Sequence, residues 1–145
     1  MDLLDFDTKN AGARPLRLLH PATGEPLGTE KEPSQVWLYG ADSPEFERAQ
    51  SVARLKVLQR KKKAGDLAEM DDQEIVEMAN EMVSLDEEKT SEILAAVTSK
   101  FENIEINGNP VTDFKKAYVG FKWLREQCDA HLSNRANFMP SASKA

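Results

Sequence analysis

The pair Ser43-Pro44 divides this chain into two parts with different residue patterns. Before the pair, apolar residues occur in short runs between turn-forming residues, which is typical of β-strands. After it, apolar residues recur three and four positions apart, which is typical of amphipathic helices. Serine caps the free amides at a helix start, and proline is favoured at the first helical position. The sequence therefore predicts an α+β fold that is dominated by helices.

The first 42 residues predict a small N-terminal antiparallel sheet. Residues 16–20 form an apolar-rich run, residues 21–26 follow as a turn, and Leu27 begins a returning strand. Residues 35–39 are β-branched and aromatic, and this run ends at Gly40. Three strands of this length are not stable alone, so we expect a helix to pack on their apolar face.

Residues 44–63 predict the first helix, which ends before Gly65. Asp71 and Glu74 have the spacing of a capping box, so a second helix begins there. We expect its pattern to break near residues 85–88 and to restart. Four residues mark the face of the restarted helix: Thr90, Leu94, Val97 and Phe101.

The pair Asn107-Gly108 lies within alternating residues and predicts a β-hairpin near residues 103–112. Thr112 is placed to cap the next helix, and Gly120 interrupts it. A last helix near residues 122–136 buries three residues at a spacing of four: Leu124, Cys128 and Leu132. With the earlier elements this makes four or five helices in all.

A single domain is predicted over residues 1–138, with a β-rich part at 1–42, a mainly helical part at 43–138 and a loose tail at 139–145. The lone Cys128 cannot form an internal disulfide, which indicates a reducing compartment. The acidic N-terminus lacks the layout of a signal peptide, and no run approaches the roughly 20 apolar residues of a membrane span. These features predict a cytosolic protein.

No pattern of catalytic or cofactor-binding residues stands out. His20 and His131 lie far apart and have no neighbouring ligand at metal-site spacing. His131 and Cys128 lie three apart on one predicted helix, but no third group orients them for catalysis. Neither a phosphate-binding loop nor a dinucleotide fingerprint occurs. The sequence therefore predicts a protein that is not an enzyme and that holds neither a cofactor nor a metal.

Charge is distributed unevenly along the chain. Residues 44–64 carry a net charge of +5 and residues 65–110 a net charge of −11, within a total of −6. Such a separation favours charge-steered contacts with partners or with other copies of the chain. Five basic residues of the first helix are candidate partner contacts: Arg54, Arg60, Lys61, Lys62 and Lys63.

Two hypotheses remain open for this basic helix, residues 48–63. It contacts an acidic protein surface, or it contacts the phosphates of DNA. The acidic total and the lack of aromatic residues among the basic ones favour the protein. Met78 and Met82 also remain open, because flexible methionines serve either as adaptable partner contacts or as core filling.

Short motifs occur in a fixed order in two stretches of the chain. The C-terminal stretch holds FENI at 101–104, NGNPV at 107–111, Tyr118, WLREQ at 123–127 and NRANF at 134–138. The N-terminal stretch holds LLHPATGEPL at 18–27 and GADSPE at 40–45. Their order and spacing resemble the tail assembly chaperones of long-tailed bacteriophages, the siphoviruses. Phe101 and Lys122 stand where that family often has Trp and Pro.

The resemblance implies a non-enzymatic chaperone of the host cytoplasm that is absent from the mature virion. Such proteins bind the tape-measure protein, keep it soluble and recruit tail tube subunits around it. The family commonly makes a longer product by ribosomal frameshifting, so this chain would be the short form. Its expected partners are then the tape-measure protein, the tail tube protein, the longer form and other copies of itself. No membrane contact is expected, and the charge pattern favours protein partners over nucleic acid.

The same resemblance places partner contacts in the C-terminal third of the chain. Four residues are expected there: Trp123, Arg125, Gln127 and Phe138. The alternative is a small phage regulator or virion-associated protein that contacts DNA through the basic helix. A permanent structural component of the tail is a third possibility, and its presence in virions would distinguish it.

Overall fold

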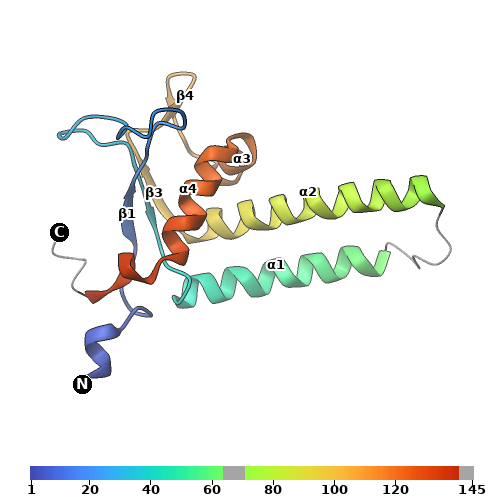
Figure 1. Cartoon of the computed structure of the whole chain (residues 1–145), viewed down its shortest axis with the longest axis horizontal. Helices are drawn as coiled ribbons and strands as arrows, with labels where there is room; N and C mark the ends of the chain where they lie inside the picture. Colours follow the sequence, from blue (N-terminus) through green and yellow to red (C-terminus); the bar gives the residue numbers. More distant parts are fainter. Residues whose placement is uncertain (64–70, 141–145) are drawn as a thin grey trace.

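A long helical hairpin projects from a small mixed body of strands and shorter helices (Figure 1). The computed structural model describes residues 1–63 and 71–140. The body contains the sheet, the last two α-helices and the ends of the hairpin helices nearest to it. This arrangement confirms the predicted α+β class, with a small antiparallel sheet and mainly helical structure after it.

The sheet has three antiparallel strands in the order β1 (Arg14–Arg17), β2 (Gln35–Leu38) and β3 (Thr98–Glu102). The third strand thus comes from after the second helix, and the prediction that Leu27 begins it was wrong. The segment around Leu27 forms only isolated bridges, Leu19 to Pro26 and Gly28 to Pro33. Proline has no N–H to donate, so a continuous ladder does not form there.

The first long helix, α1 (Pro44–Lys63), has the predicted bounds. The backbone N–H of Phe46 donates to Ser43 Oγ at 3.1 Å, so Ser43 caps the helix as predicted. The predicted stop at Gly65 lies outside the described residues.

The second long helix, α2 (Asp72–Val97), begins as predicted, because Asp71 accepts a hydrogen bond from the Glu74 N–H at 2.8 Å. The predicted break near residues 85–88 was wrong, because this stretch contains neither glycine nor proline and the helix is continuous. It ends where Thr98 Oγ1 donates to the Leu94 carbonyl at 2.6 Å. Phe101 therefore lies in β3 and not on a helix face.

The predicted hairpin is present as β4 (Glu105–Ile106) and β5 (Asn109–Pro110). Asn107 and Gly108 have φ values of 53° and 77°, which is the backbone that a two-residue type I′ turn requires. The next helix, α3 (Phe114–Gly120), is capped by Asp113. The predicted cap at Thr112 was wrong by one position, because Asp113 accepts from the Lys116 N–H.

The last α-helix, α4 (Lys122–Ser133), begins directly after Phe121, so the predicted interruption at Gly120 is confirmed. It ends three residues earlier than predicted, because Asn134 leaves helical geometry and caps a short 3₁₀ turn, η3 (Arg135–Phe138). A similar turn at the other end of the chain is η1 (Leu3–Phe6).

The core lies between the sheet, the end of α2, α3 and α4. Its buried members are Leu18, Val36, Leu38, Leu94, Val97, Ala117, Tyr118, Leu124, Cys128 and Leu132. The predicted burial of the three α4 residues is therefore confirmed. Burial raises the pKa of the Cys128 thiol to about 12, so this thiol stays protonated and unreactive at neutral pH. The parts of α1 and α2 that project from the body lie outside this core.

Candidate functional site

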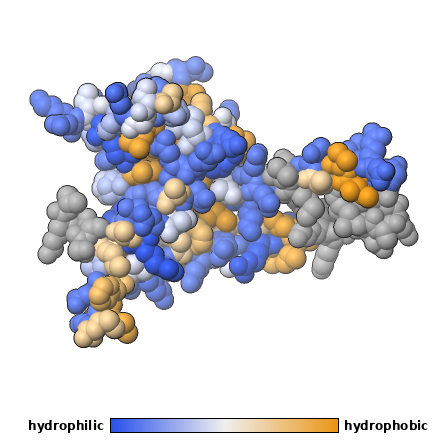
Figure 2. Space-filling view, in the orientation of Figure 1, coloured by the Kyte–Doolittle hydropathy of each residue, from blue (hydrophilic) through white to orange (hydrophobic). Residues whose placement is uncertain are grey.

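The projecting hairpin carries large apolar side chains that face solvent. On α1, Leu55 and Leu58 are 61% and 55% exposed, and Val52 is about half exposed. On the first turns of α2, Ile75 and Val76 are exposed as well. Figure 2 shows hydrophobic colour on this projecting part of the molecule. Exposed apolar side chains that gather on one element are typical of a binding surface.

Helix α1 has more apolar residues than its buried face can hold. Ala53 is buried against the rest of the molecule, and Phe46 and Ala49 pack at the edge of the core. The stripe that these residues form uses one face of the helix. Leu55 and Leu58 lie outside that stripe. Val52 has the helical spacing of the stripe, but its side chain is about half exposed. We call Val52, Leu55 and Leu58 the α1 apolar row.

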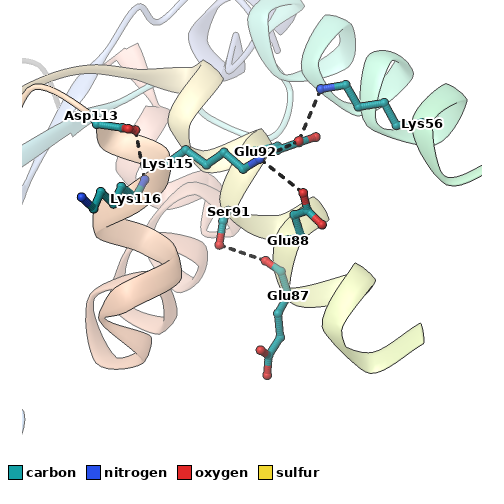
Figure 3. Close-up of polar contacts among 8 residues, drawn as sticks. All are labelled: Lys56, Glu87, Glu88, Ser91, Glu92, Asp113, Lys115 and Lys116. Atoms are coloured by element: carbon teal, nitrogen blue, oxygen red, sulfur yellow. Dashed lines mark hydrogen bonds and ion pairs between the residues drawn. The ribbon is translucent and has the colours of Figure 1, made fainter. Parts of the chain in front are cut away.

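A network of charged side chains fastens the base of the hairpin (Figure 3). Glu92 on α2 accepts hydrogen bonds from Lys56 on α1 at 3.3 Å and from Lys115 on α3 at 3.0 Å. Lys115 also contacts Glu88 at 3.3 Å. Burial alone would raise the pKa of Glu92, but the hydrogen bonds from Lys115 and Lys56 outweigh it and lower the pKa. The three helices are thereby joined by one ionised carboxylate.

A groove of about 450 Å³ opens beside this network, between α1 and α2. Its floor consists of small apolar residues: Ala49, Val52, Ala53, Ala95 and Ala96. Its rim carries three cations and two carboxylates: Arg48, Lys56, Lys115, Glu45 and Glu92. We call this feature the α1–α2 groove.

Of the predicted basic contacts, Arg54 is exposed on α1. The side chains of the other four, Arg60, Lys61, Lys62 and Lys63, lie outside the described residues, although the helix includes their backbone. The same holds for Met78 and Met82 within α2, so their role stays a prediction.

The predicted contacts in the C-terminal third are mostly engaged within the chain. Arg125 is buried and donates from Nη1 to the Tyr118 carbonyl at 3.1 Å. Gln127 pairs through both amide atoms with the backbone of Leu19, at 2.9 and 3.0 Å. These contacts hold α4 to α3 and to the N-terminal loops, and they leave Arg125 in the interior rather than on a binding surface.

Phe138 and Trp123 also pack against other residues of the chain. Phe138 is 2% exposed and closes the core next to Gly40, and Trp123 is half-buried against the core cluster. Phe138 therefore belongs to the interior and not to the surface on which we expected it. Leu55, Leu58 and the groove were not predicted, and their signal in the sequence is the apolar surplus of residues 52–58.

His131 is also buried, with its ring edge-on to Phe138 at 5.4 Å between centroids. Burial lowers its pKa below the ordinary 6.5, against an opposing hydrogen bond with the Arg14 backbone. His131 is therefore a histidine packed at the edge of the core.

The lowered pKa of His131 predicts a pH dependence of stability. Below pH 6.5 the unfolded chain binds a proton at this position that the folded chain binds less readily, so the free energy of unfolding falls as the pH falls. We expect His131→Asn to flatten this dependence between about pH 7 and pH 5, in urea titrations at each pH. The control is Ser133→Asn, an exposed position on the same helix whose side chain does not titrate. An equal flattening in both variants would contradict the prediction.

In the part of the chain that the structure describes, no group of three His, Cys, Asp or Glu side chains is placed to hold a metal ion. None of the helices described there is long and apolar enough to cross a membrane. Comparison with protein-family models, with curated proteins and with solved structures gave no match.

Proposed function

We propose that this chain is a non-enzymatic binding protein that holds an extended helical client along its projecting hairpin. The observation that carries the proposal is the α1 apolar row, which faces solvent on an element that stands away from the core. An amphipathic helix of the client packs its own apolar side chains against this row. In this role the protein acts through contact alone.

The strength of such a contact suits a transient binder. Burying a half-exposed Val or Leu contributes about 1 kcal/mol, so the row contributes about 3 kcal/mol before the entropy of association is subtracted. One copy therefore binds weakly and reversibly. A long client is held only when several copies line up on it, because their contacts then add.

The two motif stretches resemble siphovirus tail assembly chaperones, and this resemblance suggests which protein is the client. We propose that it is the tape-measure protein, and that the chain also recruits tail tube subunits in the host cytoplasm and is absent from the finished virion. A chaperone that must leave its client benefits from weak contacts. Detection of the chain in purified virions would contradict this role and favour a permanent tail component.

The client surface is tested by placing charges in the apolar row. In Leu55→Asp/Leu58→Asp we expect a loss of about 2 kcal/mol, or roughly 30-fold in affinity for the tape-measure protein. The soluble fraction of the co-expressed client is expected to fall to its level without chaperone. The control is Val119→Asp/Phe121→Asp, which places the same two charges on exposed apolar residues at the end of α3.

Two results would oppose the proposal in different ways. If wild-type chain leaves the tape-measure protein insoluble, the chaperone role is wrong. If the wild type solubilises the client and the double variant does so equally well, the role stands and the apolar row is the wrong surface.

The DNA hypothesis has narrower support. Arg48 and Arg54 are exposed on α1, but Lys56 is already paired with Glu92. Titration with duplex DNA at two salt concentrations separates the two hypotheses, because phosphate contacts weaken steeply with salt. Micromolar binding with that dependence would favour the DNA reading.

A further inference from the structure

The first six residues form an exposed arm, which we call the N-terminal arm. Within it Leu3, Leu4 and Phe6 are 74%, 72% and 53% exposed. Side chains three residues apart lie on the same side of a 3₁₀ turn. Leu3 and Phe6 therefore share an apolar edge. Asp5 lies on the same turn, and Asp2 precedes the turn as its N-cap, where its side chain accepts from the Leu4 N–H at 3.0 Å. An ordered turn with this much exposed apolar surface is suited to insertion into an apolar site.

Hydrogen bonds at the base of the arm fix the direction in which it leaves the body. Thr8 Oγ1 donates to Asp42 Oδ2 at 2.7 Å, just before α1 begins. The guanidinium of Arg135 holds the same carboxylate through two bonds, at 2.8 and 3.2 Å. Asp7 closes a tight turn by accepting from the Lys9 N–H. In Figure 1 the arm stands away from the body, at the end opposite the hairpin tip.

The α1–α2 groove has the chemistry that complements this arm. Its floor of alanines and Val52 is apolar, and its volume of about 450 Å³ lies in the ordinary range of binding sites, roughly 300–1,000 Å³. Its rim carries three cations and two carboxylates. Lys56 and Lys115 are paired with Glu92, and Lys115 also with Glu88, whereas no described residue pairs with Arg48. A segment with apolar side chains and neighbouring carboxylates can pack on this floor and pair with Arg48.

We propose that the N-terminal arm of one copy docks in the α1–α2 groove of a second copy. Leu3 and Phe6 lie on the alanine floor, and the carboxylates of Asp2 and Asp5 face Arg48 and the lysines. The anchor at Asp42 directs the arm away from the groove of its own chain. Because arm and groove are different surfaces, the contact is head-to-tail and leaves a free arm and a free groove at the two ends. This inference does not depend on the identity of the client.

Two variants remove the two halves of the contact separately. Leu3→Ser/Phe6→Ser disables the arm at exposed positions, so the fold is unaffected. Ala96→Glu places a carboxylate on an exposed position of the groove floor and disables the groove. The matched control is Ala130→Glu, which makes the same change at an exposed position of α4. Circular dichroism confirms the fold of each variant.

Sedimentation measures association of the full chain up to about 500 μM, since interfaces below roughly 1,200 Å² are weak. We expect wild type and Ala130→Glu to form oligomers that lengthen with concentration, and each disabled variant to remain monomeric. A mixture of the two disabled variants restores one working arm and one working groove. It is expected to form dimers and nothing longer.

Several outcomes would overturn the proposal. A wild-type chain that is monomeric throughout would mean that no such contact forms between copies, including the case in which the arm folds onto its own groove. Association that survives in either disabled variant would place the contact elsewhere. A mixture that stays monomeric, while wild type associates, would exclude the pairing of this arm with this groove.

Discussion

Replacing Phe138 by alanine is expected to lower the free energy of unfolding by about 3–5 kcal/mol, the range for removing a buried aromatic side chain. The ring is fully enclosed, with Gly40 on one side and His131 edge-on at 5.4 Å. Urea unfolding followed by circular dichroism measures the change. Phe121→Ala is the control, because Phe121 is exposed and its loss is expected to change stability by under about 1 kcal/mol.

A double-mutant cycle with Gly40 tests the contact itself. A Cβ at position 40 would lie 2.8 Å from Cγ of the Phe138 ring, which is too close for the ring to remain in place. We expect Gly40→Ala to destabilise the wild type by about 1–3 kcal/mol through overpacking, and to do so much less in the Phe138→Ala background. Equal effects in both backgrounds would show that the ring does not pack on Gly40.

The elements that the sequence predicted correctly depend on short-range signals. Ser43 and Asp71 cap the helices that follow them, and Asn107-Gly108 makes its turn, because each acts within three or four residues. The third strand depends instead on pairing between residues more than sixty positions apart, as in Val36 with Phe101. Local patterns carry no information about such pairing, and the same limit applies to Phe138 against Gly40.

The candidate site was less predictable than the fold. The arm and groove consist of residues whose exposure depends on which neighbours fail to cover them, and a periodic pattern does not reveal this. Val52 fits the apolar stripe of α1 but is exposed, and Arg125 is polar but buried. The charge pattern predicted the basic helix from Arg48 to Lys63, whereas the groove beside Arg48 is evident only in the structure.

The second large effect is expected at Tyr118, which joins α3 to the end of α2. The residue is completely buried, and its ring lies edge-on to Phe101 at 5.7 Å. Tyr118→Ala should lower the free energy of unfolding by about 3–5 kcal/mol, because a cavity would open between the helices and β3. Guanidinium unfolding measures this loss. The comparison is Val119→Ala, the exposed neighbour on the same helix, for which we expect under about 0.5 kcal/mol.

The hydroxyl of Tyr118 makes a separable contribution. Thr98 Oγ1 donates to the Leu94 carbonyl at 2.6 Å, so its single hydrogen is used and the Tyr118 hydroxyl, at 2.7 Å, donates to it. Tyr118→Phe keeps the ring and is expected to cost about 1 kcal/mol. Thr98→Val removes the hydroxyl that bonds both the Leu94 carbonyl and Tyr118, and is expected to cost about 1–3 kcal/mol. The double variant should cost less than the sum, because each single variant already removes the bond between the two side chains, and strict additivity would argue against that bond. Since α3 also supplies Lys115 to Glu92, loss of this joint is expected to loosen the base of the hairpin on which client binding depends.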